Sequence, residues 1–449
     1  MKKIFQYIML AVVTIVMASC TSDIEEPTAT TGKNNVQLVV GEFPAFGDSQ
    51  TRAIGTPDEG KTSWAEGDEL LLEIDNTSYG RHNATFTYNG KSWELTSGEL
   101  VYLEGDPAYI SHVYYAPNYK WEAGKLVLKE GKDPGTDEYI EGKARITGNG
   151  ETITVSFAEA TRKYSRLRIA TLPNEQITVD TEYFTPAGSS DMEQNGNYTL
   201  TSDEKGNAYL YGTFENNSEV TVKYREAALT TYTFSQATES AKSYALDATV
   251  ISANSAEEIK SAIEQKVADG KTTIRLNLAP NAGTNEFMAI REAIKGAAPN
   301  DLGTIELTII GVETIPEEAF YKMLQLKSVR MSDVKEIKKY AFKECQYLTV
   351  VEAPSLNKLC SGAFKKCDQL AKLTFGPINY ADERNWPIFE YITPNIDLIL
   401  SDYQKEMIET DSYLYTANND RDYAGSDEHN SKNFLGREFR SITCRYKVK

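Results

Sequence analysis

Short runs of hydrophobic residues, separated by polar turns, fill residues 36–250. The runs, such as "ELLLEI", "TITVSF" and "AYLYGTF", are rich in β-branched and aromatic residues, and Gly, Asn, Asp and Pro stand between them. Asn89-Gly90 and Asn149-Gly150 are dipeptides that favour tight turns between strands. The pattern predicts many short strands and no long amphipathic helix. It is typical of antiparallel β-sandwiches, and its length suits two of them.

The period of the pattern changes after Val250. Ser255 and Glu258 form the sequence of a capping box, hydrophobic residues then recur at helical spacing, and Gly270 follows, which predicts a helix. A second helical pattern occupies residues 286–298, and each helix is followed by a strand pattern. Two helix–strand units in succession predict parallel strands stacked along one axis.

A step of 22 residues governs the next segment. Four hydrophobic positions keep this step over three copies: Phe320, Phe342 and Phe364; Leu326, Leu348 and Leu370; Ile315, Ile337 and Leu359; Val329, Val351 and Leu373. Repeats of about 20–29 residues with leucine positions are typical of leucine-rich-repeat solenoids, in which each turn contributes one strand. The sequence therefore predicts a mixed, mainly β fold, in which two sandwiches precede an α/β leucine-rich-repeat solenoid.

Two cysteines, Cys345 and Cys367, occupy the same position of consecutive repeats, and Met323 occupies it in the copy before them. A position that accepts both Cys and Met is a hydrophobic interior position, so we expect buried core thiols. Adjacent turns lie about 4.8 Å apart, so a disulfide between them stays open as an alternative. Zinc needs closely spaced ligands, and the sequence has no CxxC or HxxxH pair. Cys360 and Cys444 add no such pair, and no metal site is predicted.

The first residues have the pattern of a secretory signal, with Met1-Lys2-Lys3, an apolar stretch, and small residues before Cys20. "MASC" resembles the lipobox of bacterial lipoproteins, in which this cysteine becomes the lipidated first residue. The resemblance implies a signal peptide over residues 1–19, a palmitate-bearing anchor at Cys20 and attachment to the outer membrane. Residues 20–35 are polar and acidic, which is typical of a flexible tether. They are also similar to the acidic export signal of Bacteroidota surface lipoproteins, which implies exposure on the cell surface.

Charge and residue types narrow the function further. The formal net charge of −18 disfavours nucleic acid as a partner, because such a chain repels phosphate groups. The three histidines, His82, His112 and His429, are scattered, and no nucleophile elbow, P-loop or dinucleotide-binding motif occurs. Residues 420–431 resemble a calcium loop only in part, because Ala424 stands where a ligand is required. The sequence therefore predicts neither an enzyme nor a bound metal or cofactor.

Several segments of the first half resemble the fimbrillin family: "SQTRAIGTPDEGKTSWAEGDELLLEI", "HVYYAP", "VSFAEATRKYSRLRIA" and "ESAKSYALDATV". Many members carry His where this chain has Ala160-Thr161-Arg162. The resemblance implies two transthyretin-like sandwiches, at residues 36–160 and 161–250. Polymerising members are cut after an arginine and then accept a neighbour's strand, which makes Arg52 a candidate processing site. An ordinary surface arginine is the alternative interpretation of Arg52.

The repeat pattern "I-x-x-x-A-F-x-x-C-x-x-L-x-x-V" resembles the BspA-like group of bacterial leucine-rich repeats, from about Thr304 to Gly376. We therefore expect the solenoid, with its helix–strand entry, at residues 251–376. Residues 377–449 depart from the repeat and end in the strand pattern "SITCRYKV", which is suited to close the open end of a solenoid.

Alternation of side chains along each strand separates an inner face from an outer face. If Leu326, Val329 and Met331 point inward, their neighbours point outward. The predicted outer face holds Ser328, Arg330 and Ser332 in one turn, Val350, Glu352 and Pro354 in the next, and Lys372, Thr374 and Gly376 in the third. We predict that this face binds a partner; a solvated face without a partner is the alternative.

Together these features favour a lipid-anchored cell-surface adhesin or recognition protein. It would bind a protein or glycan on a host or neighbouring cell through its leucine-rich repeats. Two alternatives stay open. One is an accessory or tip subunit of a fimbrillin-type pilus, joined to other subunits by strand exchange. The other is a glycan-binding surface lipoprotein, because the 27 tyrosines include rings that could stack on sugars.

Overall fold

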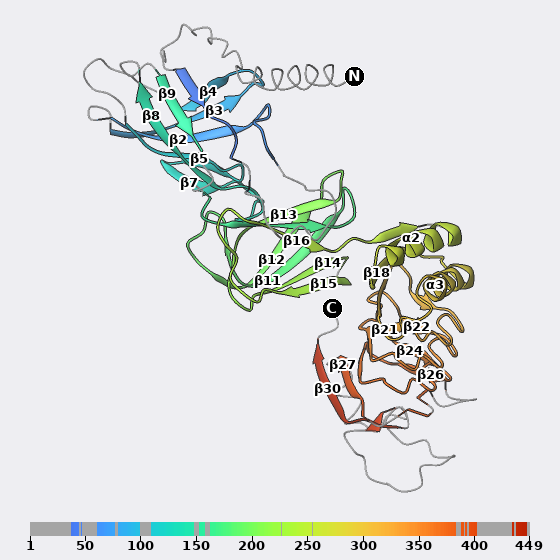
Figure 1. Ribbon diagram of the computed structural model, residues 1–449. Coiled ribbons are helices and arrows are strands. Elements are labelled where there is room, and N and C mark those ends of the chain that lie inside the picture. Colours follow the sequence, from blue (N-terminus) through green and yellow to red (C-terminus); the bar gives the residue numbers. More distant parts are fainter. Residues whose placement is uncertain are drawn as a thin grey trace, which may run out of the picture. The chain divides into compact units, whose positions relative to one another are not determined.

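The computed structural model describes residues 37–446 except for 45, 47–60, 77–79, 99–108, 148–151, 158–161, 226, 254, 383–387, 390, 393–394, 402–432 and 435–436 (Figure 1). Cys20 and Arg52, the predicted lipidation and processing residues, therefore lie outside the described part of the chain. The fold is mainly β, with several sheets and, among the described residues, two helices. Neither helix is long and apolar enough to cross a membrane.

The described residues divide into two compact units, one ending at Lys163 and one beginning at Tyr164. The first unit contains a seven-stranded sheet in the order β1-β9-β8-β5-β2-β3-β4 and a hairpin, β6-β7. Their bounds are β1 (Gln37–Val40), β2 (Glu69–Asn76), β3 (Gly80–Tyr88), β4 (Trp93–Gly98), β5 (Tyr109–Tyr115), β6 (Tyr119–Glu122), β7 (Lys125–Leu128), β8 (Ile140–Thr147) and β9 (Thr152–Ser156). β1 and β4, the two ends of the sheet, contact each other, so the sheet curls around one core.

The sequence of β2 shows how this core forms. Leu70, Leu72 and Ile74 are fully buried, because every second residue of the strand faces the core. The predicted turn at Asn89-Gly90 connects β3 to β4. Gly90 has a φ of 88°, a left-handed conformation that glycine adopts without steric strain.

The second unit begins with another seven-stranded sheet, in the order β15-β14-β11-β13-β10-β16, with β12 paired to β11. Its strands are β10 (Ser165–Ala170), β11 (Gln176–Pro186), β12 (Glu193–Thr201), β13 (Asn207–Phe214), β14 (Glu219–Tyr224), β15 (Ala227–Thr233) and β16 (Ser243–Asp247). Neither β11 nor β12 is among the strands predicted from the sequence. Asp, Glu, Asn and Gly interrupt the hydrophobic residues of both strands, so neither contains a continuous apolar run.

In both sheets, the first described strand pairs with the last strand in parallel orientation. β1 pairs with β9, starting with Gln37 opposite Thr152, and β10 pairs with β16, starting with Arg166 opposite Ser243. The prediction of purely antiparallel sheets is therefore wrong at these two pairs. Hydrophobic alternation identifies a strand but not its direction, which depends on the long connection that brings the chain back beside its first strand.

A parallel sheet of eight strands follows, β17-β18-β19-β21-β23-β25-β27-β30, together with a four-stranded parallel sheet, β20-β22-β24-β26, and a short hairpin, β28-β29. The eight strands are β17 (Ile251–Ala253), β18 (Thr273–Leu278), β19 (Ile305–Ile310), β21 (Leu326–Arg330), β23 (Val350–Ala353), β25 (Lys372–Phe375), β27 (Asp397–Ser401) and β30 (Ser441–Tyr446). The others are β20 (Thr314–Ile315), β22 (Glu336–Ile337), β24 (Lys358–Cys360), β26 (Tyr380–Asp382), β28 (Asn433–Phe434) and β29 (Arg437–Glu438). The pairs within the eight-stranded and four-stranded sheets are parallel, as the helix–strand pattern predicted, whereas β28 and β29 pair in antiparallel orientation.

The two helices precede β18 and β19. In α2 (Ala256–Ala268), the Ser255 side chain accepts a hydrogen bond from the Glu258 N–H at 3.2 Å, as the capping sequence predicted. α3 (Thr284–Ala297) begins two residues before its predicted start. The Glu286 carboxylate accepts a hydrogen bond from the Gly283 N–H at 2.8 Å, which stabilises this earlier first turn.

The step of 22 residues places identical side chains on top of one another in the core. Phe320, Phe342 and Phe364 are fully buried, and their ring centroids are separated by 5.1 and 5.4 Å in stacked geometry. Phe287 of α3 and Phe389 extend this phenylalanine column at its two ends, each with a centroid distance of 5.7 Å. Each ring therefore packs against the ring of the next turn, and the column connects α3 to the last repeats.

We expect Phe342→Ala to lower the free energy of unfolding by about 3–5 kcal/mol, because it removes a buried ring that contacts rings on both sides. Met288→Ala on α3 is the control, since Met288 is 41% exposed, and its effect should stay within about 0.5 kcal/mol. Denaturant unfolding followed by circular dichroism measures both. Equal effects would contradict a stabilising role for the phenylalanine column.

Candidate partner-binding face

The predicted face is built on three neighbouring parallel strands, β21, β23 and β25. The strand register sets Ser328 opposite Val350 and Val350 opposite Lys372, and it sets Arg330 opposite Glu352 and Glu352 opposite Thr374. All of these side chains are half-buried or exposed. The residues between them, Val329, Val351 and Leu373, are fully buried. Two rows of side chains therefore cross the strands on the side away from the core.

The edge of the predicted face needs one correction. Gly376 is buried, and a Cβ added to it would lie 2.6 Å from the carbonyl oxygens of Pro354 and Leu356. It therefore belongs to a close backbone contact between turns and not to the outer face. Pro354 and Ser332, which follow β23 and β21, are half-buried.

Charged side chains of the face pair with each other across the strands. Arg330 Nε lies 2.9 Å from Glu352 Oε2, and Lys372 Nζ lies 3.9 Å from Glu352 Oε1. These pairs are partly exposed, so each contributes little to stability. They do compensate the charges of the face. This pairing was not predicted from the sequence. The repeat step indicates the pair, since Arg330 and Glu352 lie one repeat apart and carry opposite charges.

The compensation continues at the C-terminal end of the sheet. Lys372 stands opposite Asp397 of β27 in the strand register. Arg440 Nε donates to Asp397 Oδ1 at 2.8 Å, and the Ser441 hydroxyl donates to the same oxygen at 2.6 Å. These hydrogen bonds, first from Arg440 and then from Ser441, lower the pKa of Asp397 to about 2. Asp397 therefore stays ionised at neutral pH and paired with its neighbours.

The chain itself covers the N-terminal end of the outer face. Arg275 of β18 is 5% exposed, and its Nε donates to the backbone oxygen of Leu229 in β15 at 2.6 Å. Burial lowers the pKa of Arg275, and the attraction of Asp247 opposes this effect. Ile310 of β19 is buried in the hydrophobic core of the sheet that contains β15. The cover lies at Arg275 and Ile310, so we place the partner-binding face on β21, β23 and β25.

The repeated cysteines are core thiols. Cys345 and Cys367 are free and fully buried, and their Sγ atoms donate to the backbone oxygens of Phe320 and Phe342 at 3.0 Å each. Burial raises the pKa of Cys345 to about 12 and that of Cys367 well above its ordinary value. Neither thiol is therefore available as a thiolate nucleophile or metal ligand at neutral pH.

Among the residues that the structure describes, acidic, histidine and cysteine side chains are also not gathered as in a metal centre. No group of three or more such residues in the described part of the chain could hold a metal ion. His112 Nδ1 lies 3.3 Å from Glu141 Oε1 on the surface, and His82 Nδ1 lies 3.2 Å from the backbone oxygen of Gly80. His429 lies outside the described residues.

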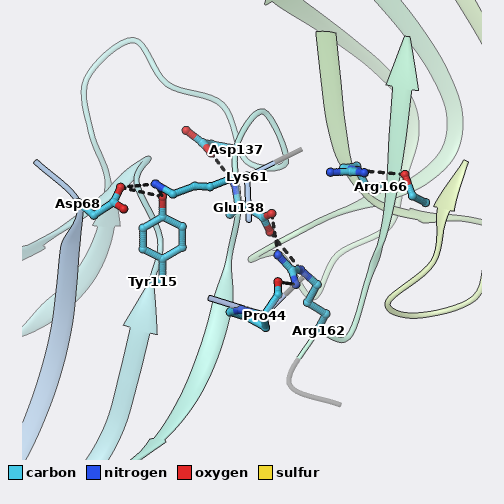
Figure 2. Close-up of polar contacts among 9 residues, drawn as sticks. Pro44, Lys61, Asp68, Tyr115, Asp137, Glu138, Arg162 and Arg166 are labelled. Atoms are coloured by element: carbon cyan, nitrogen blue, oxygen red, sulfur yellow. Dashed lines mark hydrogen bonds and ion pairs between the residues drawn. The ribbon is translucent and has the colours of Figure 1, made fainter. Parts of the chain in front are cut away.

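A buried ion pair that was not predicted from the sequence lies in the first unit (Figure 2). Arg162 Nη2 lies 2.8 Å from Glu138 Oε1, and both side chains are buried. The same guanidinium donates to the backbone oxygen of Pro44 and lies over the rings of Phe43 and Phe46. It thus holds Phe43, Pro44 and Phe46 against the sheet. Loss of one partner would leave a buried charge uncompensated, which is strongly destabilising.

A second polar cluster fixes Lys61, the first described residue after the 47–60 gap (Figure 2). Lys61 Nζ donates to the Tyr115 hydroxyl at 2.8 Å and binds Asp68, and the Tyr115 hydroxyl donates to Asp68 at 3.1 Å. Burial, followed by the charge of Asp68, raises the pKa of Tyr115. Burial also raises the pKa of Asp137 nearby, although the N–H of Glu138 opposes this effect. The polar atoms of both clusters therefore serve to fix the chain.

Comparison with known proteins bears on the repeats. The family model described as "BspA type Leucine rich repeat region (6 copies)" matches residues 301–404, which confirms the resemblance predicted for the repeats and extends it beyond Gly376. No curated protein sequence matches the chain. Among solved structures, the crystal structure of GBS52, the minor pilin of Streptococcus agalactiae, is similar at 9% identity and a TM-score of 0.16, over 48% of this chain and 94% of that chain. Values this low carry no argument. The fimbrillin-like and lipoprotein resemblances stay predictions.

We expect iodoacetamide at pH 8 to leave Cys345 and Cys367 unmodified in the folded protein, because both thiols are buried and protonated. Cys360 is only partly buried and serves as the internal control that reacts. Peptide mass spectrometry before and after denaturation measures the modified fraction of each. Rapid labelling of Cys345 in the folded protein would show that the repeat core is open to solvent.

Proposed function

We propose that this chain is a lipid-anchored cell-surface adhesin or recognition protein. It binds a protein on a host or neighbouring cell through the outer face of its leucine-rich repeats. The observation that carries the proposal is the set of in-register parallel strands that present Ser328, Arg330, Val350, Glu352, Lys372 and Thr374 on one side. The match of residues 301–404 to BspA type repeats supports it, since leucine-rich repeats offer extended binding surfaces.

In the architecture that we propose, an anchor at Cys20 and a tether over residues 20–35 precede two β-sandwiches, at 36–160 and 161–250. A solenoid over 251–376 and a closing region over 377–449 follow. The shared arrangement of the two seven-stranded sheets, in which first and last strands pair in parallel, supports two copies of one fold. Attachment to the outer membrane by a lipid places the repeats outward, where a partner can reach them.

The charges of the face decide how a partner is recognised. Because Glu352 already pairs with both Arg330 and Lys372, the face presents little net charge. A partner is therefore recognised by hydrogen bonds to these charged groups and by contact with Val350 and Thr374 between them, and not by long-range attraction. Such a face favours shape and hydrogen-bond specificity over a fast, salt-dependent association rate.

We expect the double variant Arg330→Ala with Glu352→Ala to weaken attachment of the purified protein to partner cells at least about tenfold, because it removes the central hydrogen-bonding groups. Flow cytometry with labelled protein measures attachment. The matched control is Glu313→Ala with Lys335→Ala, another ion pair between consecutive turns, with 2.5 Å between Nζ and Oε1, that lies outside the face. Unchanged attachment of the first variant, with the fold intact, would remove the face from consideration.

A second candidate function is assembly into a pilus by strand exchange. β1 favours it, because this strand has four residues, lies at the end of its sheet and pairs in parallel with β9. A short edge strand is the element that a neighbour's strand would replace. Leu38 is buried in the core, and the guanidinium of Arg162 holds Pro44 beyond the strand, so the first unit retains β1 in this state.

The two functions differ in what intact cells carry. We expect antibody to residues 304–449 to detect a single lipid-bearing band in surface material run on a denaturing gel without boiling, because a free-standing binder forms no exchanged strands. The boiled sample is the control. A ladder of polymers that collapses to one band on boiling would replace the adhesin proposal with pilus assembly.

A further inference from the structure

The eight-stranded parallel sheet begins with β17, which has a neighbour on one side only. β17 pairs with β18, where Ser252 stands opposite Asn277, and no strand in the described part of the chain pairs with its other edge. Every later strand of this sheet except the last lies between two neighbours. The free edge of β17 therefore offers backbone N–H and C=O groups to a further strand.

A groove lies between β17 and α2 at this end of the sheet. Its volume is about 590 Å³, which is in the range of clefts that hold ligands. The helix residues that line it recur at steps of four, so they belong to one face of α2. This groove, which we call the β17 groove, is lined by the three residues of β17 and by Glu257, Glu258, Ser261, Ala262 and Gln265.

The length of the β17 groove matches a short strand. α2 begins soon after β17 ends, so Glu257 lies at the end of the groove next to Ala253, and Gln265 lies toward the other end. The helix rises about 12 Å from Glu257 to Gln265. An extended chain covers this distance with about four residues. A strand of that length would therefore lie along β17 and against α2.

The floor of the β17 groove is apolar. Ala253 is 5% exposed, and Ile251 and Ala262 are half-buried. Ile251 and Ala253 point to the same side of the sheet, because side chains alternate along a strand, and they pack against the core that contains Ile259 and Ile263 of α2. Every second side chain of an added strand would point the same way. A small apolar side chain there would contact Ile251 and Ala262.

The charges of the β17 groove are negative. Glu257 and Glu258 are exposed, and none of the lining residues is a lysine or an arginine. Glu257 makes no ion pair with any described residue. Carboxylates of later turns do pair with a cation one repeat away, as Glu336 does with Lys358 at 2.7 Å. The start of the sheet has no preceding turn that could supply such a cation, whereas an added strand could supply one.

The lysines of α2 pair with other groups. Lys260 Nζ lies 4.0 Å from the Glu264 carboxylate, and Lys266 donates to the Thr249 hydroxyl at 2.7 Å. Acidic residues in a first turn also stabilise a helix through its dipole, so their charge alone does not identify a binding site. Here the charge coincides with an open strand edge and with a groove of strand length, and the three together indicate a site for a strand.

We propose that the β17 groove binds an extended basic segment of a partner protein, which adds a strand to the sheet. The backbone of this segment would pair with β17. A small apolar side chain would pack on Ile251 and Ala262, and a lysine or arginine two residues away, on the same side of the strand, would pair with Glu257. In strand addition, backbone hydrogen bonds supply affinity and side-chain positions supply specificity. This site does not depend on the strand face proposed above.

Other occupants fit the β17 groove less well. A sugar chain favours aromatic faces, and the lining contains none. A second copy that paired through its own β17 would bring two sets of carboxylates together. The basic C-terminal segment of another copy, residues 439–449, is held in its own sheet, because β30 pairs with β27 and Arg440 pairs with Asp397. A partner protein is therefore the occupant that we propose.

The test uses the full chain and a short fluorescent peptide, acetyl-Lys-Ser-Val-Ser-Lys-amide. When the peptide is extended, its two lysines and its valine lie on one side, so either direction of pairing brings a lysine to Glu257. One comparison peptide carries glutamate in place of lysine. Another carries methyl groups on all backbone nitrogens, which removes the donors but keeps the charge. Fluorescence anisotropy measures the affinity of each peptide.

Two pairs of variants locate the site on α2. Ala262→Phe fills the groove, and Ala268→Phe adds the same ring outside the lining. Glu257→Gln removes a carboxylate inside the groove, and Glu264→Gln removes one outside it. We expect Ala262→Phe to weaken binding at least about tenfold and Glu257→Gln about threefold, with changes below about 1.5-fold in the two controls. Thermal unfolding establishes that each variant is folded.

Backbone methylation should weaken binding at least about tenfold, because the added strand loses its donors. No binding of the basic peptide up to about 1 mM, or equal losses in the groove variants and their controls, would overturn the proposal. Equal binding of the methylated peptide or of the acidic peptide would also overturn it, since strand pairing or recognition of a cation would then be excluded. Tighter binding of a peptide of residues 439–449, with self-association of the full chain that Ala262→Phe abolishes, would replace the partner protein with a second copy.

Discussion

The constraint on which the repeat region depends is in-register stacking of parallel turns. Each residue lies next to the residue one repeat away, as the partners Val329 and Val351 show. Inside, this produces the phenylalanine column, whose rings lie 5.1 to 5.7 Å apart. The stacking also repeats the backbone, because Lys322, Glu344 and Lys366 all adopt left-handed conformations. A conformation that costs about 1 kcal/mol or more per residue is retained because every turn must match its neighbours.

The same stacking constrains charge on the outside. Like charges in one column would repel at the strand spacing, so opposite signs alternate along most columns. The pair of Arg330 and Glu352 on the strand face is one case, and Glu336 with Lys358 is another. Such ion pairs primarily stabilise the in-register stacking of neighbouring turns. A charged residue on this surface is therefore weak evidence of a partner until its neighbour one repeat away has been considered.

The sequence predicted those features that depend on local pattern. The repeat step, the cap at Ser255 and the buried position of Cys345 all follow from which residues recur and where. Contacts between segments distant in sequence could not be predicted, because no periodicity encodes them. Arg275 with Leu229, and Arg162 with Glu138, are of this kind. The exception is Arg330 with Glu352, which the step of 22 residues would have revealed had charges been compared along it.

In a repeat structure, residues that break the repeat pattern are better evidence of function than residues that follow it. The strand face departs little from the repeat pattern, since its charges are compensated. Arg275 and Ile310 cover its N-terminal end. Selection for packing alone would also produce such a face. The strand face therefore derives its case from the family of repeats to which it is similar.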